Sequence, residues 1–421
     1  MPRFEHRETW GTRSCIFMPT TQTIETKEQI QSPTVQPHTG RLICLDVFRG
    51  LAVAGMILVD NPGSDDHAYW AIRHAEWNGW TSADFIFPSF LFLVGISMVF
   101  SFSARLSRGE SRQDIFIHVL KRCLLLILIG LFVNGFPFFN LDLSTWQFEE
   151  GFSSLRFEGV TQRIALCYFC AAVLVLWSNR RGQLIALFGC LVGYWAILRF
   201  VPVPGLGVPG RDIPFMDPDR NIAAWLDRKL FMGHLYNGTR DPEGIISTIP
   251  AIGTTLIGVL AGQWLRASRS PRTKAAYLLG ASVVGLIAGQ VWNLWFPINK
   301  NLWTSSFALF SAGFALAFLG ILYWLLEIKQ WRGMWTMPVL VFGMNAIAGF
   351  VADSLVYGPG YSFTVQGPNG SKIFLHDVVN AQFAKLGASP GFTSLLYSLG
   401  ALLFCWMLLW LLWRRRIFLK V

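Results

Sequence analysis

Long uninterrupted apolar runs dominate this sequence and limit what it can fold into. Ten runs of 18–24 residues lie at 43–60, 83–104, 115–136, 160–177, 183–201, 245–265, 275–297, 303–326, 336–357 and 393–413. A helix rises about 1.5 Å per residue, so each run can cross a hydrocarbon layer of about 30 Å. The sequence therefore predicts an all-α polytopic membrane protein, with about ten transmembrane helices in one bundle.

The composition agrees with a membrane protein. Hydrophobic side chains make up 53% of the 421 residues and charged ones 14%, against roughly 25% charged in soluble proteins. Eighteen Trp and 35 Phe suit helices whose ends lie among lipid headgroups. We expect one transmembrane domain over 41–421. The polar stretch 1–40 has no apolar core and is expected to be a disordered cytoplasmic tail.

Basic residues between the runs predict the orientation. Lys and Arg gather in the loops after the second, fourth, sixth and eighth runs and after the tenth. Such loops stay in the cytoplasm, which places both termini there and puts 60–82, 137–159, 202–244, 299–301 and 358–392 on the other face. The same distribution accounts for the net charge of +10 without a nucleic-acid partner. The seven Cys lie mostly inside apolar runs without a CxxC pair, so neither a disulfide framework nor a metal site is predicted.

The long segment 202–244 divides the runs into five and five. An odd number per half would give the halves opposite orientations, so two five-helix halves related as inverted repeats are a hypothesis. Gly258 and Gly262 form a GxxxG pattern in the sixth run, which predicts close helix packing. Asp46 and Arg49 share a face of the first run and form either an ion pair that holds the bundle or part of a site.

The connection after the first run is the richest in chemistry. It holds Asp60, Asn61, His67, His74, Trp77, Asn78 and Asp84. Polar loops of this kind often bind a ligand, and an imidazole can serve as a general base or as a nucleophile. The alternative for His74 is an ordinary surface histidine.

Other polar groups gather at the ends of the runs. Glu243 lies at the mouth of the sixth run, Lys300 and Asn301 lie between the seventh and eighth, and Asn345 and Asp353 lie in the ninth. At the cytoplasmic end, His118, Lys121 and Arg122 open the third run. They are either snorkelling membrane anchors or a phosphate site. The sequence contains no P-loop, GxSxG or HExxH motif.

Several long segments, in order, resemble the heparan-α-glucosaminide N-acetyltransferase family and its bacterial branch. They are RLICLDVFRGLAVAGMILVDNPG (41–63), RHAEWNGWTSADFIFPSFLFLVGIS (73–97), GVTQRIALCY (159–168), DPEGIISTIPAIGTTLIGVLAG (241–262), FPINKNLWTSSFALF (296–310) and FGMNAIAG (342–349). The resemblance implies a transmembrane acyltransferase domain over 41–421. Such a protein transfers acetyl from cytosolic acetyl-CoA to the amine of glucosamine or a related amino sugar across the membrane.

The resemblance also implies site residues. The active-site histidine of the family lies in a His-Ala-x-Trp-Asn-Gly motif, here His74–Gly79, and a family Asn near the end of the first run corresponds to Asp60, with Asn61 next to it. We therefore expect catalysis by His74, Asp60 and Asn61. Substrate binding is expected at Trp77, Asn78, Asp84, Glu243, Lys300 and Asn301. Binding of acetyl-CoA is expected at His118, Lys121, Arg122, Gln162, Arg163 and Asn345.

The expected location is a bacterial inner membrane, with the lipid bilayer and an amino sugar as partners and a homodimer as an open alternative.

Two other functions stay open from the sequence. A transporter of N-acetylglucosamine or a related sugar would use the same cavity without acyl chemistry. A structural scaffold fits less well with so many polar groups at the ends of the runs.

Overall fold

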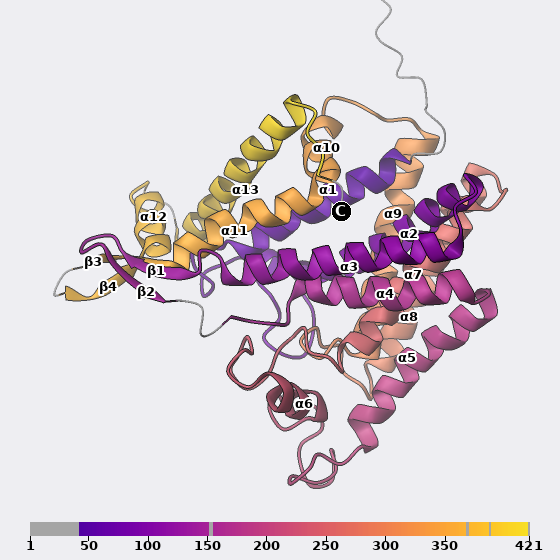
Figure 1. Cartoon of the computed structure of the whole chain (residues 1–421), viewed down its shortest axis with the longest axis horizontal. Helices are drawn as coiled ribbons and strands as arrows, with labels where there is room; N and C mark the ends of the chain where they lie inside the picture. Colours follow the sequence, from indigo (N-terminus) through magenta and orange to yellow (C-terminus); the bar gives the residue numbers. More distant parts are fainter. Residues whose placement is uncertain (1–41, 151–154, 368–369, 387–388, 420–421) are drawn as a thin grey trace, which may run out of the picture. The chain divides into compact units, whose positions relative to one another are not determined.

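The computed structural model describes residues 42–150, 155–367, 370–386 and 389–419, and the tail predicted over 1–40 lies outside them. Within the described residues, eight helices are long and apolar enough to cross a membrane. They are Ser82–Ser107 (η2, Ser82–Phe85, with α2, Ile86–Ser107), α3 (Arg112–Gly135), α4 (Val160–Trp177), α5 (Arg180–Phe200), α7 (Thr248–Arg266), α8 (Pro271–Trp292), Ser305–Ile328 (α9, Ser305–Tyr323, with a π-helical turn) and α13 (Pro390–Arg414). The predicted all-α polytopic membrane protein is confirmed, while the count of ten spans stays a prediction (Figure 1).

The first run forms helix α1 (Ile43–Asp60) over the predicted residues. It carries three charged residues, Asp46, Arg49 and Asp60, among its 18 residues. Arg49 Nη1 lies 3.1 Å from Asp46 Oδ1, and Arg49 Nη2 donates to Ser97 Oγ on α2 at 3.0 Å. The ion-pair interpretation of Asp46 and Arg49 is thus confirmed, and the pair also links α1 to its neighbour.

The ninth run requires a correction, because a single straight helix over 336–357 does not form, and whether the bent pair crosses the membrane as one span stays a prediction. Helices α10 (Thr336–Met344) and α11 (Ala346–Ser362) meet at an angle of 88° at Asn345. Asn345 is fully buried; its Oδ1 accepts the Leu419 N–H and its Nδ2 donates to the Ile417 carbonyl. Its side chain therefore ties the bend to the chain that follows α13, and buried polar atoms at the bend keep their partners.

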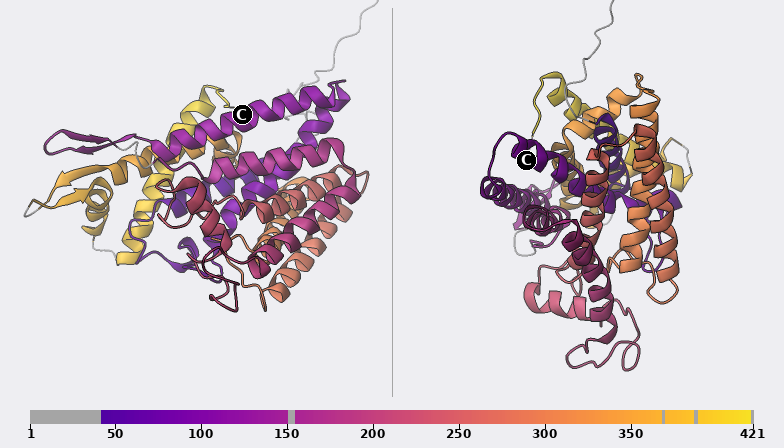
Figure 2. Two further views of the ribbon diagram at one scale, coloured as in Figure 1. Left: turned by 60° about the horizontal axis from the view of Figure 1, so that its bottom comes forward. Right: turned by 90° about the vertical axis from the view of Figure 1, so that its right-hand side faces the viewer.

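Close backbone contact between α2 and α7 holds the centre of the bundle. A Cβ added at Gly258 would lie 2.1 Å from the Phe92 carbonyl oxygen, and one at Gly262 would lie 3.1 Å from Ile96 Cα. The predicted close packing at the GxxxG pattern is confirmed. Helices α3 and α4 form a second pair, and α8 and α9 run side by side as a third (Figure 2).

The segments between the long helices contain structure that we did not predict. Strands β1 (Phe139–Asp142), β2 (Gln147–Glu150), β3 (Phe363–Gln366) and β4 (Lys372–Phe374) form a sheet in the order β2-β1-β3-β4. The β1–β3 pair is parallel and the two outer pairs are antiparallel. Figure 1 shows this sheet beside α12 (Leu375–Ala384) at the ends of α3 and α11. Two further short helices are η1 (Trp70–Ile72) and α6 (Ile222–Phe231).

The segments that we predicted on one face of the membrane meet at one end of the bundle. The sheet joins 137–159 to 358–392, the Gly79 N–H donates to the Ile298 carbonyl at 2.8 Å, and Trp77 Nε1 donates to the Met216 carbonyl at 3.1 Å. These contacts agree with the predicted grouping of the segments. Which face is cytoplasmic stays a prediction.

Replacing Gly258 by Ala should destabilise the protein. The added methyl would overlap the α2 backbone, and overpacking of this kind costs about 1–3 kcal/mol. Gly280→Ala on α8 is the matched control, because a Cβ there meets nothing within 4 Å and Ala is favoured over Gly in a helix by about 0.5–1 kcal/mol. Thermal unfolding of both variants in detergent tests this. A Gly258→Ala protein as stable as Gly280→Ala would contradict the close α2–α7 contact.

Candidate active site

Asp84 is a buried carboxylate fixed by the turn that precedes α2. Its side chain is fully buried. Oδ2 accepts the Thr81 N–H at 2.9 Å, the Thr81 hydroxyl at 3.2 Å and the Ala75 N–H at 3.3 Å. Thr81 and Asp84 thus form a capping box around η2. Oδ2 therefore has its hydrogen-bond partners within this turn, and Oδ1 is left for another partner.

His74 meets that second oxygen. His74 Nδ1 lies 2.8 Å from Asp84 Oδ1, and the side chain of His74 is 41% exposed. An ionised carboxylate only accepts hydrogen bonds, so the ring donates from Nδ1–H and Nε2 keeps its lone pair. In this tautomer the lone pair of His74 lies on Nε2, and the carboxylate fixes the orientation of the ring.

Lys300 completes the cluster from the turn between α8 and α9. Its Nζ lies 3.0 Å from His74 Nδ1, 3.2 Å from His74 Nε2 and 3.6 Å from Asp84 Oδ1. An ammonium at this position balances the buried Asp84 charge and is a hydrogen-bond donor for an oxygen that becomes negative. Three residues far apart in the sequence therefore form one acid–base cluster.

Two further carboxylates border this cluster. Asp60, the last residue of α1, interacts electrostatically with His74, Lys300 and Glu243. Glu243 forms an ion pair with Arg156. The structure thus brings Asp60, Asp84, Glu243 and Lys300 into one region around His74, and the carboxylates there favour a cationic ligand.

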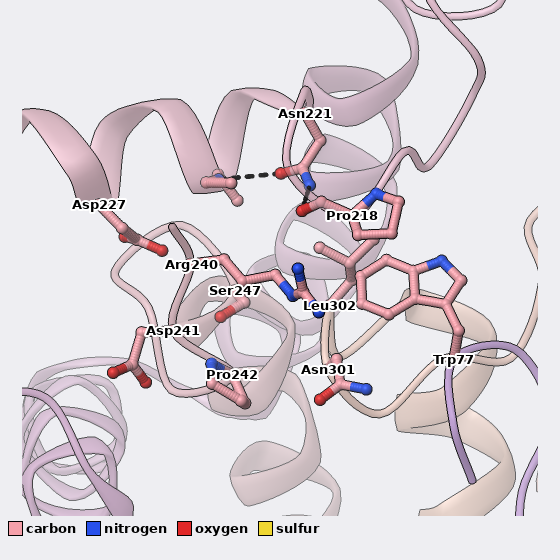
Figure 3. Close-up of a pocket in the computed structure, with 12 residues that line it drawn as sticks. Trp77, Pro218, Asn221, Asp227, Arg240, Asp241, Pro242, Ser247, Asn301 and Leu302 are labelled. Atoms are coloured by element: carbon pink, nitrogen blue, oxygen red, sulfur yellow. Dashed lines mark hydrogen bonds between the residues drawn. The ribbon is translucent and has the colours of Figure 1, made fainter. Parts of the chain in front are cut away.

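Trp77, Asn78 and Asn301 lie beside the cluster. Asn78 Oδ1 accepts from Asn299 Nδ2 at 3.2 Å. Figure 3 shows a small pocket in which the Trp77 indole lies next to Pro218, with Arg240 and Asn301 nearby. The Arg240 guanidinium lies 5.5 Å from the Trp77 ring centroid, a cation–π distance. These contacts hold the His74 loop against the segment 214–247.

Asn61 has a different environment from the one expected. It is buried, and its Nδ2 donates to Asp353 Oδ1 at 2.6 Å and to the Ile57 carbonyl at 2.9 Å. The structure therefore directs Asn61 toward α11, while its neighbour Asp60 belongs to the His74 cluster. A catalytic role for Asn61 stays a prediction.

The basic residues His118, Lys121 and Arg122 lie in the first half of α3, away from the His74 cluster. The Arg122 guanidinium lies 4.9 Å from the Tyr168 ring centroid, and the Tyr168 ring is 6.5 Å from that of Phe102. Phe102 follows Asp84 by eighteen residues, a rise of about 27 Å along the helix. His118 lies one helical turn before Arg122 on α3, and Lys121 is exposed.

The other residues expected to bind cofactor do not join this basic group. Gln162 and Arg163 lie at the start of α4, on the His74 side of the bundle, where Arg163 Nη2 donates to the Gly244 carbonyl at 3.1 Å. Gln162 Nε2 and Arg163 Nε and Nη1 are buried donors without a partner among the described residues. Asn345 lies at the α10–α11 bend and bonds to backbone.

Sequence reasoning missed a charged cluster next to the site. Arg156 Nε donates to Asp241 Oδ2 at 2.7 Å, and its guanidinium also pairs with Glu243 and lies over the Tyr236 ring. Burial raises the pKa of the Asp241 carboxyl. The hydrogen bonds from Arg156 lower it by more, so the pKa lies below its ordinary value. The segment that begins with Asp241 (DPEG) indicated polar groups at this position. Nothing in 137–159 indicated that Arg156 is their partner.

Glu158 and Asp227 are buried carboxyl groups beside this ion pair. Both Glu158 oxygens lack a partner among the described residues. Burial, with Asp227 and Asp241 nearby, raises the pKa of Glu158 to about 9. Burial, with Asp241 nearby, raises the pKa of Asp227 to about 7. Glu158 is therefore protonated in the folded protein at neutral pH.

These features define a polytopic membrane protein with a histidine–carboxylate–lysine site at one end of its bundle. A family model described as "Heparan-alpha-glucosaminide N-acetyltransferase, catalytic" matches residues 41–296. Heparan-alpha-glucosaminide N-acetyltransferase of Mus musculus is 31% identical over 77% of this chain, and that of Homo sapiens is 32% identical over 76%. The chain belongs to the heparan-alpha-glucosaminide N-acetyltransferase family. The match covers 55% of the length of each of these curated relatives.

Replacing Glu158 by Gln should flatten the pH dependence of stability. The folded protein keeps the Glu158 proton up to about pH 9, while the unfolded chain loses it near its ordinary pKa of about 4.3. Stability therefore falls as pH rises through this window. Asp227, with a pKa of about 7, is half-ionised at about pH 7 and titrates in both proteins. Between about pH 7 and about pH 9, the Tm of the wild type should fall by several degrees more than that of Glu158→Gln. Parallel Tm curves for the two proteins would show that Glu158 is not buried as a neutral acid.

Proposed function

We propose that this protein transfers acetyl from acetyl-CoA to the amine of glucosamine or a related amino sugar. The observation that carries the proposal is the His74–Asp84 contact at 2.8 Å, with Lys300 on the same ring, inside a chain of this family. A base next to a cationic donor is what acyl transfer to an amine requires. We place the site on the non-cytoplasmic face of a bacterial plasma membrane, with both termini in the cytoplasm.

The carboxylates near His74 suit an amino sugar. At neutral pH the amine of glucosamine is largely an ammonium ion, and the carboxyl groups of Asp60 and of Glu243, which is paired with Arg156, are the groups that we assign to it. Trp77 and Asn78 from the same loop, with Asn301 opposite, offer a ring and amide groups to the sugar. This arrangement fits the binding of a small cationic sugar near the basic nitrogen.

The reaction needs one proton transfer before the attack. His74 Nε2 takes a proton from the ammonium, and the free amine then attacks the thioester carbonyl. The new C–N bond forms as the C–S bond breaks, and the second proton that the nitrogen loses as it becomes the amide passes to the departing thiolate, which leaves as the CoA thiol. His74 then releases the first proton to solvent. Lys300 is placed to donate to the carbonyl oxygen while it carries negative charge. If Nε2 attacks first and carries the acetyl group, the same residue is still required.

The length of the bundle indicates how acetyl-CoA would lie. A pantetheine arm has about as many bonds as four or five extended residues, and so reaches about 15–20 Å. The rise between Asp84 and the level of Arg122 is about 27 Å, so the arm covers most of this distance and the diphosphate at its end extends it further. We therefore assign the nucleotide phosphates, beyond the arm, to Arg122 with His118 and Lys121. The unpartnered donors of Gln162 and Arg163 would meet the carbonyl oxygens nearer the thioester.

Replacing His74 by Ala should abolish acetyl transfer. The loss of the base slows transfer by at least about 10²–10⁴-fold, the usual contribution of general-base catalysis, while acetyl-CoA should still bind. His67→Ala is the matched control, because His67 is exposed in the same loop and should keep most of the activity. The measurement uses purified protein, labelled acetyl-CoA and glucosamine.

Three outcomes separate the alternatives. Label retained on the wild-type protein without acceptor, and absent from the His74→Ala protein, would support an acetyl-enzyme over direct transfer. A wild-type protein that neither binds acetyl-CoA nor transfers label, yet binds N-acetylglucosamine, would favour the transporter. A folded His74→Ala protein with near wild-type transfer would exclude His74 as the base.

A further inference from the structure

The turn between α8 and α9 is held in shape by hydrogen bonds of its own side chains. Asn293 Oδ1 accepts the Ile298 N–H at 2.7 Å, and Asn299 Oδ1 accepts the Leu302 N–H at 2.8 Å. Thr304 Oγ1 accepts the Asn299 N–H at 3.0 Å. Asn299 is fully buried. These bonds lie within the turn, so they fix the backbone around Asn299.

Two hydrogen bonds join this turn to the loop that carries His74. The Gly79 N–H donates to the Ile298 carbonyl at 2.8 Å, and Asn299 Nδ2 donates to Asn78 Oδ1 at 3.2 Å. The two bonds involve consecutive residues in both segments, so they align the loop with the turn. Asn299 thus closes the turn with its side-chain oxygen and contacts the loop with its side-chain nitrogen.

Lys300 follows Asn299 directly and meets the His74 ring across the same junction. Its Nζ lies 3.0 Å from His74 Nδ1 and 3.2 Å from His74 Nε2. A Lys side chain is a flexible four-carbon stem, so these short distances depend on where the backbone places the Lys300 Cα. A misplacement of about 1 Å in an active site can slow a reaction by about 10²-fold.

We propose that Asn299 is a positioning residue for acetyl transfer. Its amide holds the backbone of Lys300 against the loop that carries His74, so that the ammonium and the imidazole stay side by side while the thioester is attacked. Asn299 acts through Lys300, because its own side chain is fully buried and both of its polar atoms are bonded within the protein. This proposal rests on the proposed acetyltransferase function, which assigns the chemistry to these two neighbours.

A double-mutant cycle separates positioning from a general loss of stability. Asn299→Ala removes the amide, and Lys300→Met removes the ammonium but keeps a long side chain. Asn293→Ala is the matched control, because Asn293 Oδ1 also accepts a backbone N–H of this turn, while the bond to Asn78 comes from Asn299. KM for acetyl-CoA and for glucosamine is measured in the wild-type and Lys300→Met backgrounds, with kcat counted per protein that binds acetyl-CoA.

Asn299→Ala should lower kcat at least about tenfold when Lys300 is present and leave both KM values within about twofold. When Lys300 is replaced by Met, it should lower kcat less than about twofold, because residues that act as one unit are not additive. Asn293→Ala should lower kcat less than about threefold in either background. An equal fold loss from Asn299→Ala in both backgrounds, or no loss in either, would overturn the proposal.

Hydrogen exchange of the Gly79 amide tests the junction without any substrate. The bond to Ile298 protects this amide in the wild type. Asn299→Ala should speed its exchange about three- to tenfold, the change expected from one lost hydrogen bond. Asn78→Ala removes the same bond from an exposed position, so it tests the junction even where Asn299→Ala does not fold. Mass spectrometry of the peptide that contains Gly79 measures the rates, corrected for the sequence of each variant.

This measurement separates the positioning role from the proposed function. Faster exchange in the two variants supports the junction even if the wild type transfers no acetyl group, a result that would contradict the proposed function alone. Exchange at the wild-type rate in both variants would overturn the role of Asn299 even if glucosamine is acetylated.

Discussion

The buried carboxylate of Asp84 is the interaction on which the proposed site depends. A carboxylate taken out of water is destabilising by several kcal/mol unless it is paired and hydrogen-bonded. Here Thr81 and Ala75 satisfy one oxygen, while His74 and Lys300 face the other. Because each partner stabilises the charge, the same contacts that keep Asp84 ionised fix the His74 ring and its tautomer. The turn that carries Lys300, more than two hundred residues later in the sequence, lies beside the same carboxylate.

The remaining charged groups are arranged around this centre at the ends of helices. Arg156 is paired with Asp241 and Glu243 next to the cluster, while Glu158 is buried without a partner among the described residues. Protonation therefore allows Glu158 to stay in the interior. The basic group around Arg122, near the middle of α3, lies a rise of about 27 Å along α2 from the level of Asp84. The two ends of the bundle thus differ in charge as the proposed reaction requires, with anions near the amine and cations near the nucleotide phosphates.

The sequence predicted long elements well and short or bent ones poorly. Length and apolarity determine a membrane helix, so α1 forms over 43–60 as expected and the GxxxG pattern packs as expected. The bend at Asn345 escaped prediction because apolar residues continue on both sides of it. The four strands have three or four residues each, too few for a period of two to be recognised, and their pairing depends on segments far apart in the chain.

The candidate site shows the same division. The assignment of loops to one face of the membrane predicted that His74, Glu243 and Lys300 belong together, since positive charge in short loops reports sidedness. The partners of individual side chains could not be predicted in this way. Asn61 pairs with Asp353 and Arg156 with Asp241 because of how α1, α11 and the loops pack, which neither composition nor spacing records.

A double-mutant cycle on acetyl transfer tests most directly whether Asp84 acts through His74. The rates of purified wild type, Asp84→Asn, His74→Ala and the double variant are compared with glucosamine as acceptor. Residues that act as one unit are not additive. Asp84→Asn should therefore slow transfer at least about tenfold when His74 is present and change the residual rate less than about twofold when it is absent. An equal fold loss in both backgrounds would show that Asp84 acts independently of His74, and would contradict the account.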